Sequence, residues 1–166
     1  MRIILIGLPG SGKTSLGKQL ANRMNLPFLD LDEELELEYG KSIHEMFREE
    51  GEAGFRLMEQ ACLKRTLAKG IDMVLATGGG TPCFFDNLIW LMEAGTLVFL
   101  NPPIEVIAER RLGIAENTRP LLSGEGNLSD KLRALYQARI PFYQKAEITY
   151  AGSDANELMT LLQNRN

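Results

Sequence analysis

Cysteine is scarce in this sequence. Among 166 residues there are only Cys62 and Cys83, and they form no C-x-x-C pair. A disulfide framework needs several cysteines, and a structural zinc site usually draws on closely spaced pairs. The sequence therefore argues against both kinds of site, and it fits a reducing compartment.

Long hydrophobic runs are also missing. A membrane-spanning helix needs about 18 or more consecutive apolar residues, and no stretch approaches that length. The opening MRIILIGLPGSG carries an apolar run that is too short for a signal peptide. We therefore expect a cytoplasmic protein that has no membrane partner.

A basic excess is absent as well. The chain has 18 basic and 22 acidic residues, which gives a net charge of −4. This argues against nucleic acid as a partner, but not against an anion site with local basic groups. Residues 30–52 hold ten acidic residues beside Lys41 and Arg48, as on a solvated helix face. Length and a hydrophobic fraction of 45% predict one globular domain, 1–166, and we expect a monomer.

Short apolar runs alternate with helical patterns along the chain. We expect strands at 2–7, 27–30, 71–77, 96–101 and 147–151. We expect helices at 12–24, 33–40, 42–50, 52–69, 86–93, 103–112, 128–138 and 154–163. This alternation predicts an α/β fold, a five-stranded parallel sheet with helices on both faces. Residues 113–127 carry no period, and a connection this long is typical of a mobile lid or of a disordered segment.

The sequence GLPGSGKT, residues 7–14, matches the phosphate-loop pattern G-x-x-x-x-G-K-[ST] completely. Gly7, Gly10 and Gly12 permit a tight loop whose backbone N–H groups turn toward phosphate oxygens. Lys13 can bridge two phosphates, and the Thr14 hydroxyl can bind Mg²⁺. The predicted nucleotide-binding residues in this loop are Gly10, Ser11, Gly12, Lys13, Thr14 and Ser15.

The stretch PFLDLDEELE places two carboxylates, Asp30 and Asp32, where a strand should end. In extended chain they would point to the same side, roughly 6.5 Å apart. One interpretation is a capped helix start. The other follows from the magnesium site, which usually takes a second anchor from a strand end. Because the strands that end at Thr77 and Asn101 supply no Asp, Asp30 becomes the candidate anchor, and Asp32 could face an acceptor.

Two features could serve a second substrate. GFRLMEQ sets Arg56 and Glu59 on one helix face, either as a surface ion pair or as part of a site. Three glycines, Gly78–Gly80, follow a buried strand. They either form a plain tight turn or let the backbone approach a ligand closely.

Several arginines have both a structural and a functional interpretation. Arg119 in NTRPLL is either an ordinary exposed residue or a lid cation that closes over the transferring phosphoryl group. Arg139 lies just before Pro141, where the helix should end, so it could simply complement a helix C-terminus. Arg110 and Arg111 are either helix-dipole partners or contacts on the adenine side, and the sequence does not separate the two.

Taken in order, these pieces resemble one family, shikimate kinase. GLPGSGKT is followed by DLDEEL, SIHEMFREEGEAGFRLMEQ, TGGG, TRPLL and RIPFY, and the agreement spans nearly the whole chain. The phosphate loop alone is widely shared. The combination of D-x-D, F-R-x-x-E, the triple glycine and R-P-L-L is specific.

The resemblance implies a P-loop kinase fold. It implies transfer of the ATP γ-phosphoryl group to the 3-hydroxyl of shikimate, within chorismate and aromatic amino acid biosynthesis. ATP and shikimate are the implied partners, and Mg²⁺ is the implied cofactor. On the nucleotide side, it implies that Lys13 contacts the phosphates, that Thr14 binds magnesium and that Asp30 holds magnesium through water. Arg119 on the lid would contact the nucleotide phosphates.

On the acceptor side, the resemblance implies that Asp32 binds and orients the attacking hydroxyl. Arg56 and Arg139 would clamp the shikimate carboxylate, and Gly78–Gly80 would offer backbone contacts. The acceptor-binding helical region would span about residues 31–60. The implied catalytic residues are Lys13, Asp32 and Arg119.

Two alternatives remain at this point. Another small-molecule or nucleoside monophosphate kinase could share the fold, since a fold does not fix the acceptor. A monophosphate acceptor would need a cluster of cations, whereas the stretch 30–52 is mostly acidic. A GTP-dependent switch would need an Asn-Lys-x-Asp guanine reader, which the sequence lacks.

Overall fold

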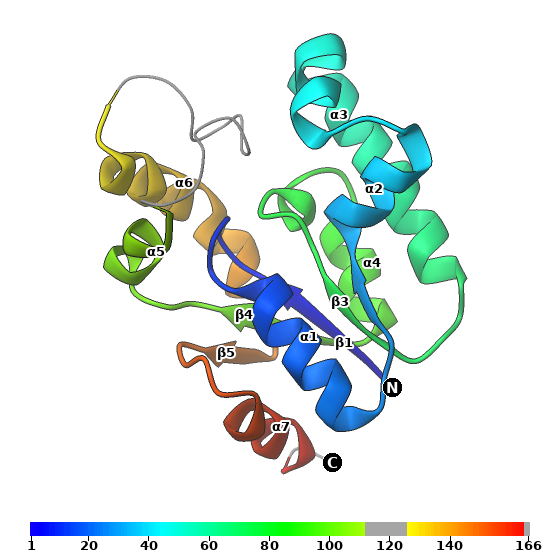
Figure 1. Cartoon of the computed structure of the whole chain (residues 1–166), viewed down its shortest axis with the longest axis vertical. Coiled ribbons are helices and arrows are strands. Elements are labelled where there is room, and N and C mark those ends of the chain that lie inside the picture. The colour runs from blue at the N-terminus through cyan, green and yellow to red at the C-terminus, as the bar shows by residue number, and fades with distance from the viewer. Residues whose placement is uncertain (112–125, 165–166) are drawn as a thin grey trace.

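The computed structural model describes residues 1–111 and 126–164, and in this part of the chain five parallel strands form one sheet (Figure 1). The order of the strands across the sheet is β2-β3-β1-β4-β5. The strands are β1 (Arg2–Ile6), β2 (Phe28–Asp30), β3 (Met73–Ala76), β4 (Thr96–Leu100) and β5 (Ile148–Tyr150).

Helices connect the successive strands, as parallel pairing requires. They are α1 (Lys13–Met24), α2 (Leu31–Tyr39), α3 (Ile43–Ala68), α4 (Asn87–Ala94), α5 (Ile104–Arg111), α6 (Leu128–Tyr143) and α7 (Ala155–Gln163). A short 3₁₀ turn, η1 (Thr81–Cys83), follows the triple glycine. The predicted α/β fold with a five-stranded parallel sheet is confirmed.

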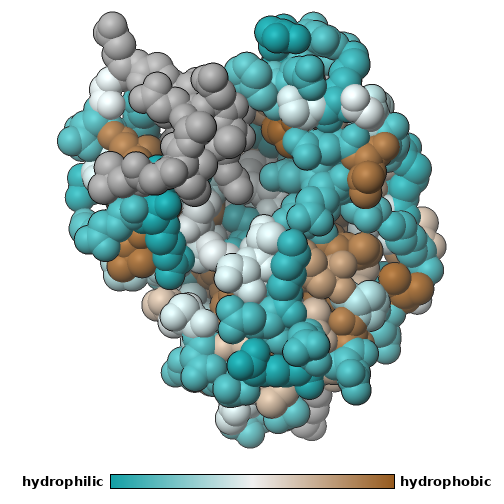
Figure 2. All heavy atoms as spheres, viewed as in Figure 1, coloured by the Kyte–Doolittle hydropathy of each residue, from teal (hydrophilic) through white to brown (hydrophobic). Residues whose placement is uncertain are grey.

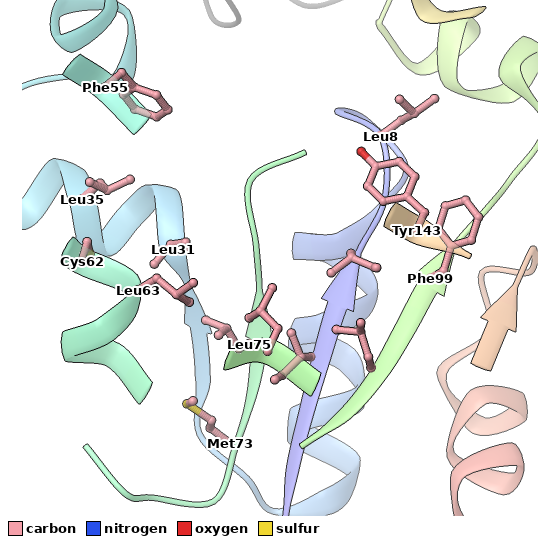
Figure 3. Close-up of a cluster of buried hydrophobic side chains, with 14 of the residues drawn as sticks. Leu8, Leu31, Leu35, Phe55, Cys62, Leu63, Met73, Leu75, Phe99 and Tyr143 are labelled. Carbon is pink, nitrogen blue, oxygen red and sulfur yellow. The ribbon is translucent and has the colours of Figure 1, made fainter. Parts of the chain in front are cut away.

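The sheet separates two hydrophobic cores, because side chains alternate along each strand. In β1, Ile4 and Ile6 belong to the core formed with residues of α2 to α6. Ile3 and Leu5 belong to the core formed with α1 and α7. Figure 3 shows part of the first core, with Tyr143 beside Phe99. Helices therefore cover both faces of the sheet, as the sequence predicts.

The start of α2 differs from the prediction. The helix begins at Leu31 rather than at residue 33, and Asp30 is its N-cap. Oδ1 of Asp30 accepts a hydrogen bond from the backbone N–H of Asp32 at 3.0 Å. The two carboxylates therefore do not lie on one extended strand, and that expectation was wrong. A cap satisfies an otherwise unpaired N–H, which favours the earlier start.

The end of α6 was also predicted wrongly. The helix continues through Pro141 to Tyr143. Proline removes only one backbone donor, and the N–H of Gln144 still donates to the carbonyl of Ile140 at 3.0 Å. The continuation buries Tyr143 completely against Phe99, with 4.9 Å between the ring centroids. Tertiary burial therefore outweighs the local signal of proline.

Other local predictions fare differently. The break expected between helices 42–50 and 52–69 is a kink at Gly51, whose backbone is non-helical (φ 67°, ψ 178°). The predicted lid, 113–127, lies almost wholly outside the described residues, and Arg119 lies outside them as well.

On the face that Figure 2 shows, hydrophilic residues dominate and hydrophobic ones lie in separate groups. None of the helices described in 1–111 and 126–164 is long and apolar enough to cross a membrane.

Candidate active site

The candidate site lies at the carboxyl ends of β1, β2 and β3, which are neighbours in the sheet. The phosphate loop follows β1, the D-x-D motif begins at the last residue of β2, and the triple glycine follows β3. In parallel α/β sheets ligands bind at this edge. Three motifs that are far apart in the sequence therefore meet at one place.

The backbone of the phosphate loop requires glycine at three positions. Gly7, Gly10 and Gly12 have φ values of 145°, 83° and 98°, in the region that favours glycine. A Cβ atom at Gly7 would lie only 2.5 Å from the carbonyl oxygen of Leu100. The loop leads directly into α1, whose N-terminal N–H groups favour an anion.

Two polar side chains of this loop are buried. Nζ of Lys13 donates to the carbonyl oxygens of Gly7 and Leu8, both at 2.9 Å. The hydroxyl of Ser11 has no hydrogen-bond partner among the described residues. A buried hydroxyl without a partner is costly, and a phosphate oxygen would satisfy it.

Thr14 and Asp30 are brought together, as the magnesium hypothesis requires. The Thr14 hydroxyl donates to Oδ2 of Asp30 at 2.6 Å. Hydroxyl and carboxylate oxygens suit Mg²⁺, which commonly takes one or two protein ligands and completes its shell with phosphate and water. The donor set therefore fits a nucleotide-bound magnesium ion.

The triple glycine is the meeting point of the predicted acceptor residues. A Cβ atom at the successive positions of Gly78–Gly80 would lie 3.1 Å from Oδ1 of Asp32, 2.9 Å from Nη1 of Arg139 and 2.4 Å from Nη2 of Arg56. The glycines therefore permit three charged side chains to approach the backbone, and a plain tight turn does not explain them.

Arg56 and Glu59 are both buried, so the surface ion-pair interpretation is wrong. Their side chains are 4% and 1% exposed, and Nη1 of Arg56 lies 3.0 Å from Oε2 of Glu59. Nη2 of Arg56 lies 3.4 Å from Oε1 of Glu52. Nε of Arg56 has no hydrogen-bond partner in the described part of the chain. Glu59 therefore holds the Nη1 side of the Arg56 guanidinium, and the Nε–H group is left to donate to a ligand.

Arg139 is a second buried guanidinium. It is 6% exposed, and within 1–111 and 126–164 its Nη1 has no hydrogen-bond partner. Because α6 continues to Tyr143, Arg139 does not mark a helix end. Burial raises the pKa of the Tyr143 phenol above its ordinary value, although the nearby Arg139 charge acts in the opposite direction. Two buried arginines with unpaired N–H groups are typical of an anion site, and their planar forks suit a carboxylate.

Sequence reasoning missed three residues at this site. The Thr81 hydroxyl donates to Oε1 of Glu59 at 2.7 Å, and the Phe84 ring lies 4.2 Å from Cζ of Arg56. The Tyr143 hydroxyl donates to the carbonyl of Gly79 at 2.5 Å. Tyr143 was visible in the RIPFY motif but lay beyond the expected helix end. No pattern in the sequence indicates the roles of Thr81 and Phe84.

A hollow of about 380 Å³ lies beside the phosphate loop. Nη1 of Arg110 lies 3.4 Å from the carbonyl oxygen of Ser11. Arg111 instead sets its aliphatic part 3.3 Å from a Cβ position at Gly10. Arg110 rather than Arg111 therefore lines the hollow. The lining residues are Ser11, Gly12, Ser15, Leu16, Gln19, Arg110, Gly152 and Ser153.

A phosphate loop, an oxygen pair suited to magnesium and a separate pair of buried arginines together define a P-loop kinase of a small molecule. The family model described as Shikimate kinase matches residues 9–164. The chain therefore belongs to the shikimate kinase family.

Individual comparisons agree with this assignment. A shikimate kinase from Bacteroides thetaiotaomicron is 42% identical over 160 residues, which cover 95% of this chain and 89% of the relative. The structure of an Acinetobacter baumannii shikimate kinase in complex with shikimate superposes with a TM-score of 0.91 at 34% identity, and the match covers 99% of this chain and 94% of the other. A gluconokinase from Sinorhizobium meliloti is 18% identical with a TM-score of 0.59, so that likeness shows the fold alone.

Proposed function

We propose that the protein transfers the γ-phosphoryl group of ATP to the 3-hydroxyl of shikimate, giving shikimate 3-phosphate and ADP. The observation that carries this proposal is the pair of buried guanidiniums, Arg56 and Arg139, which lie against the successive glycines Gly80 and Gly79. Shikimate is a small carboxylate that carries hydroxyl groups. Its carboxylate suits the arginine forks, and its hydroxyls suit the carboxylate of Asp32.

On the nucleotide side, the phosphate loop would hold the phosphates of ATP. Lys13 would turn from the loop carbonyls to the phosphates, and the Ser11 hydroxyl would find an acceptor there. Thr14 and Asp30 would hold Mg²⁺, Asp30 through water. When bound, magnesium supplies positive charge to the β- and γ-phosphate oxygens. Arg119, on the predicted lid, would add charge to the transferring group.

On the acceptor side, Arg56 and Arg139 would fix the carboxylate, and backbone groups of Gly79 and Gly80 would contact the ring substituents. Asp32 would accept a hydrogen bond from the attacking hydroxyl and point it at the γ-phosphate. Phosphoryl transfer through a loose transition state depends mainly on positioning and charge, so this role does not require a strong base.

An assay of ADP release across several acceptors tests the proposal. We expect turnover with shikimate to exceed turnover with gluconate or a nucleoside monophosphate by several orders of magnitude. Preference for either of the other acceptors would assign the chain to another kinase of the same fold. Equal ADP release with and without shikimate would indicate an ATPase or a switch.

We also predict that the protein is a monomer and that it works in the cytoplasm. Both cysteines, Cys62 and Cys83, are free thiols, which supports a reducing compartment. Light scattering on the protein as it elutes from a size-exclusion column measures the oligomeric state. A mass near 18.5 kDa is expected for the monomer.

A further inference from the structure

The buried side chains around Arg56 form a short chain of hydrogen bonds that starts in the 3₁₀ turn η1. The Thr81 hydroxyl donates to Oε1 of Glu59 at 2.7 Å, and Oε2 of Glu59 accepts from Nη1 of Arg56 at 3.0 Å. Thr81 is fully buried, and its backbone carbonyl accepts a 2.9 Å hydrogen bond from the amide of Asn87. Each carboxylate oxygen of Glu59 thus has its own donor.

The other side of the same guanidinium lies on an aromatic ring. Cζ of Arg56 is 4.2 Å from the centroid of Phe84, which follows η1 directly. The rings of Phe55 and Phe47 are farther away, at 5.3 and 5.8 Å. A cation over a ring face gains electrostatic stabilisation and loses rotational freedom. The segment 81–84 therefore touches Arg56 through Glu59 and through Phe84.

We propose that Thr81 and Phe84 are positioning residues that set the affinity for the acceptor by holding the Arg56 guanidinium in one orientation. This inference rests on the proposed role of Arg56 as a ligand of the acceptor carboxylate. Thr81 contacts Glu59 and Phe84 contacts Arg56, so their effect should fall on acceptor binding rather than on the chemical step.

The physical reason is that the two oxygens of Glu59 accept hydrogen bonds from different donors. With the Thr81 hydroxyl on Oε1, Glu59 offers one oxygen to Nη1 of Arg56. Nε of Arg56 then has no partner among the described residues, and Nη2 makes only a long 3.4 Å contact with Glu52, so both can turn to a ligand. Without that hydroxyl, Oε1 is buried and lacks a donor, which is costly. The carboxylate then gains most by taking two N–H groups from Arg56 in a bidentate pair. That pairing draws the guanidinium away from the acceptor.

Steady-state kinetics of the Thr81→Val variant tests the positioning role of Thr81. We expect KM for shikimate to rise about tenfold, with kcat and KM for ATP unchanged within about twofold. Thr81→Ser keeps the hydroxyl and should restore KM. Thr66→Val makes the same change at a fully buried site on α3, beside Cys62, and should leave KM for shikimate unchanged.

The Phe84→Leu variant tests the positioning role of Phe84, since leucine keeps an apolar side chain but lacks the ring face. We expect KM for shikimate to rise about threefold. Phe85→Leu is the matched control, because Phe85 is the next residue in the chain and is 55% exposed. A control that raises KM as much as its partner variant would overturn the proposal.

A third variant separates this inference from the function on which it rests. Arg56→Lys keeps the charge but loses the fork. If Arg56→Lys raises KM for shikimate while Thr81→Val and Phe84→Leu do not, the positioning role is wrong and the carboxylate site stands. If Arg56→Lys leaves KM unchanged, the assignment of Arg56 to the acceptor is itself wrong.

Discussion

The Thr14 hydroxyl donates a 2.6 Å hydrogen bond to Oδ2 of Asp30, which joins the start of α1 to the end of β2. The other oxygen of that carboxylate accepts from the N–H of Asp32 and caps α2. One side chain therefore serves both the helix cap and the proposed magnesium site. The capping and metal interpretations of Asp30, which looked like alternatives in the sequence, are compatible.

Asp30→Asn separates these two roles. Asparagine is as good an N-cap as aspartate, so the thermal midpoint should hardly change. It lacks the negative charge, so half-maximal activity should need about tenfold more free Mg²⁺ at fixed ATP. Asp30→Ala should show the same magnesium shift and also lose about 1 kcal/mol of stability. A magnesium titration unchanged in both variants would remove Asp30 from the metal site.

Asp32→Asn tests the proposed orientation of the attacking hydroxyl. Turnover should fall by about 10²–10⁴-fold if the carboxylate accepts the proton or aligns the hydroxyl, while ATP binding persists. Glu33→Gln is the matched control, because Glu33 lies in the same first turn of α2 and its side chain is 57% exposed. Turnover of Asp32→Asn equal to that of the control would exclude Asp32 from the mechanism.

Much of the fold was predictable because its signals are local. The uniformly apolar run before Gly7 marks a strand buried on both faces, and the positive φ of Gly7, Gly10 and Gly12 follows from the loop pattern. The break between helices 42–50 and 52–69 was expected as well, and it falls at Gly51. The end of α6 was not, because the burial of Tyr143 depends on Phe99, forty-four positions earlier in the sequence.

At the site, too, some residues could be predicted from local motifs and others depend on tertiary packing. Asp32, Arg56, Arg139 and the glycines were predicted as a set, and the structure brings them together. Thr81 was not predicted, because a threonine carries no sign of its partner until the fold places it against Glu59. Residues that touch a ligand tend to belong to motifs, whereas residues that hold them in place depend on tertiary packing.

Arg139→Ala should weaken acceptor binding selectively. Removing one partner of a buried charge pair costs about 2 kcal/mol or more, so KM for shikimate should rise by about 30-fold or more. KM for ATP should stay within about twofold. Arg133→Ala is the matched control on the same helix, since the Arg133 side chain is 52% exposed and pairs only at the surface. Equal losses of ATP and shikimate affinity in Arg139→Ala would contradict the carboxylate clamp.

The thiol of Cys83 should react slowly although it lies near the charges of Arg139 and Arg56. Burial raises its pKa to about 11, and the nearby charges of Arg139 and Arg56 only partly oppose this shift. Compared with the ordinary value of 9.0, the thiolate fraction at pH 8 falls about 100-fold. Alkylation by iodoacetamide at pH 8, followed by peptide mass spectrometry, should therefore label Cys83 about 100-fold more slowly in the folded than in the unfolded protein.

The same raised pKa makes a prediction about stability. The unfolded chain loses the Cys83 proton near pH 9, whereas the folded chain keeps it until about pH 11. The unfolded state then binds fewer protons, so the free energy of unfolding should fall as pH rises through this window. Burial raises the pKa of Cys62 to about 11 as well and adds to the slope. Denaturant titrations at pH 8 and pH 10 measure the fall. Cys83→Ser should reduce the slope, and an unchanged slope would show that Cys83 ionises alike in both states.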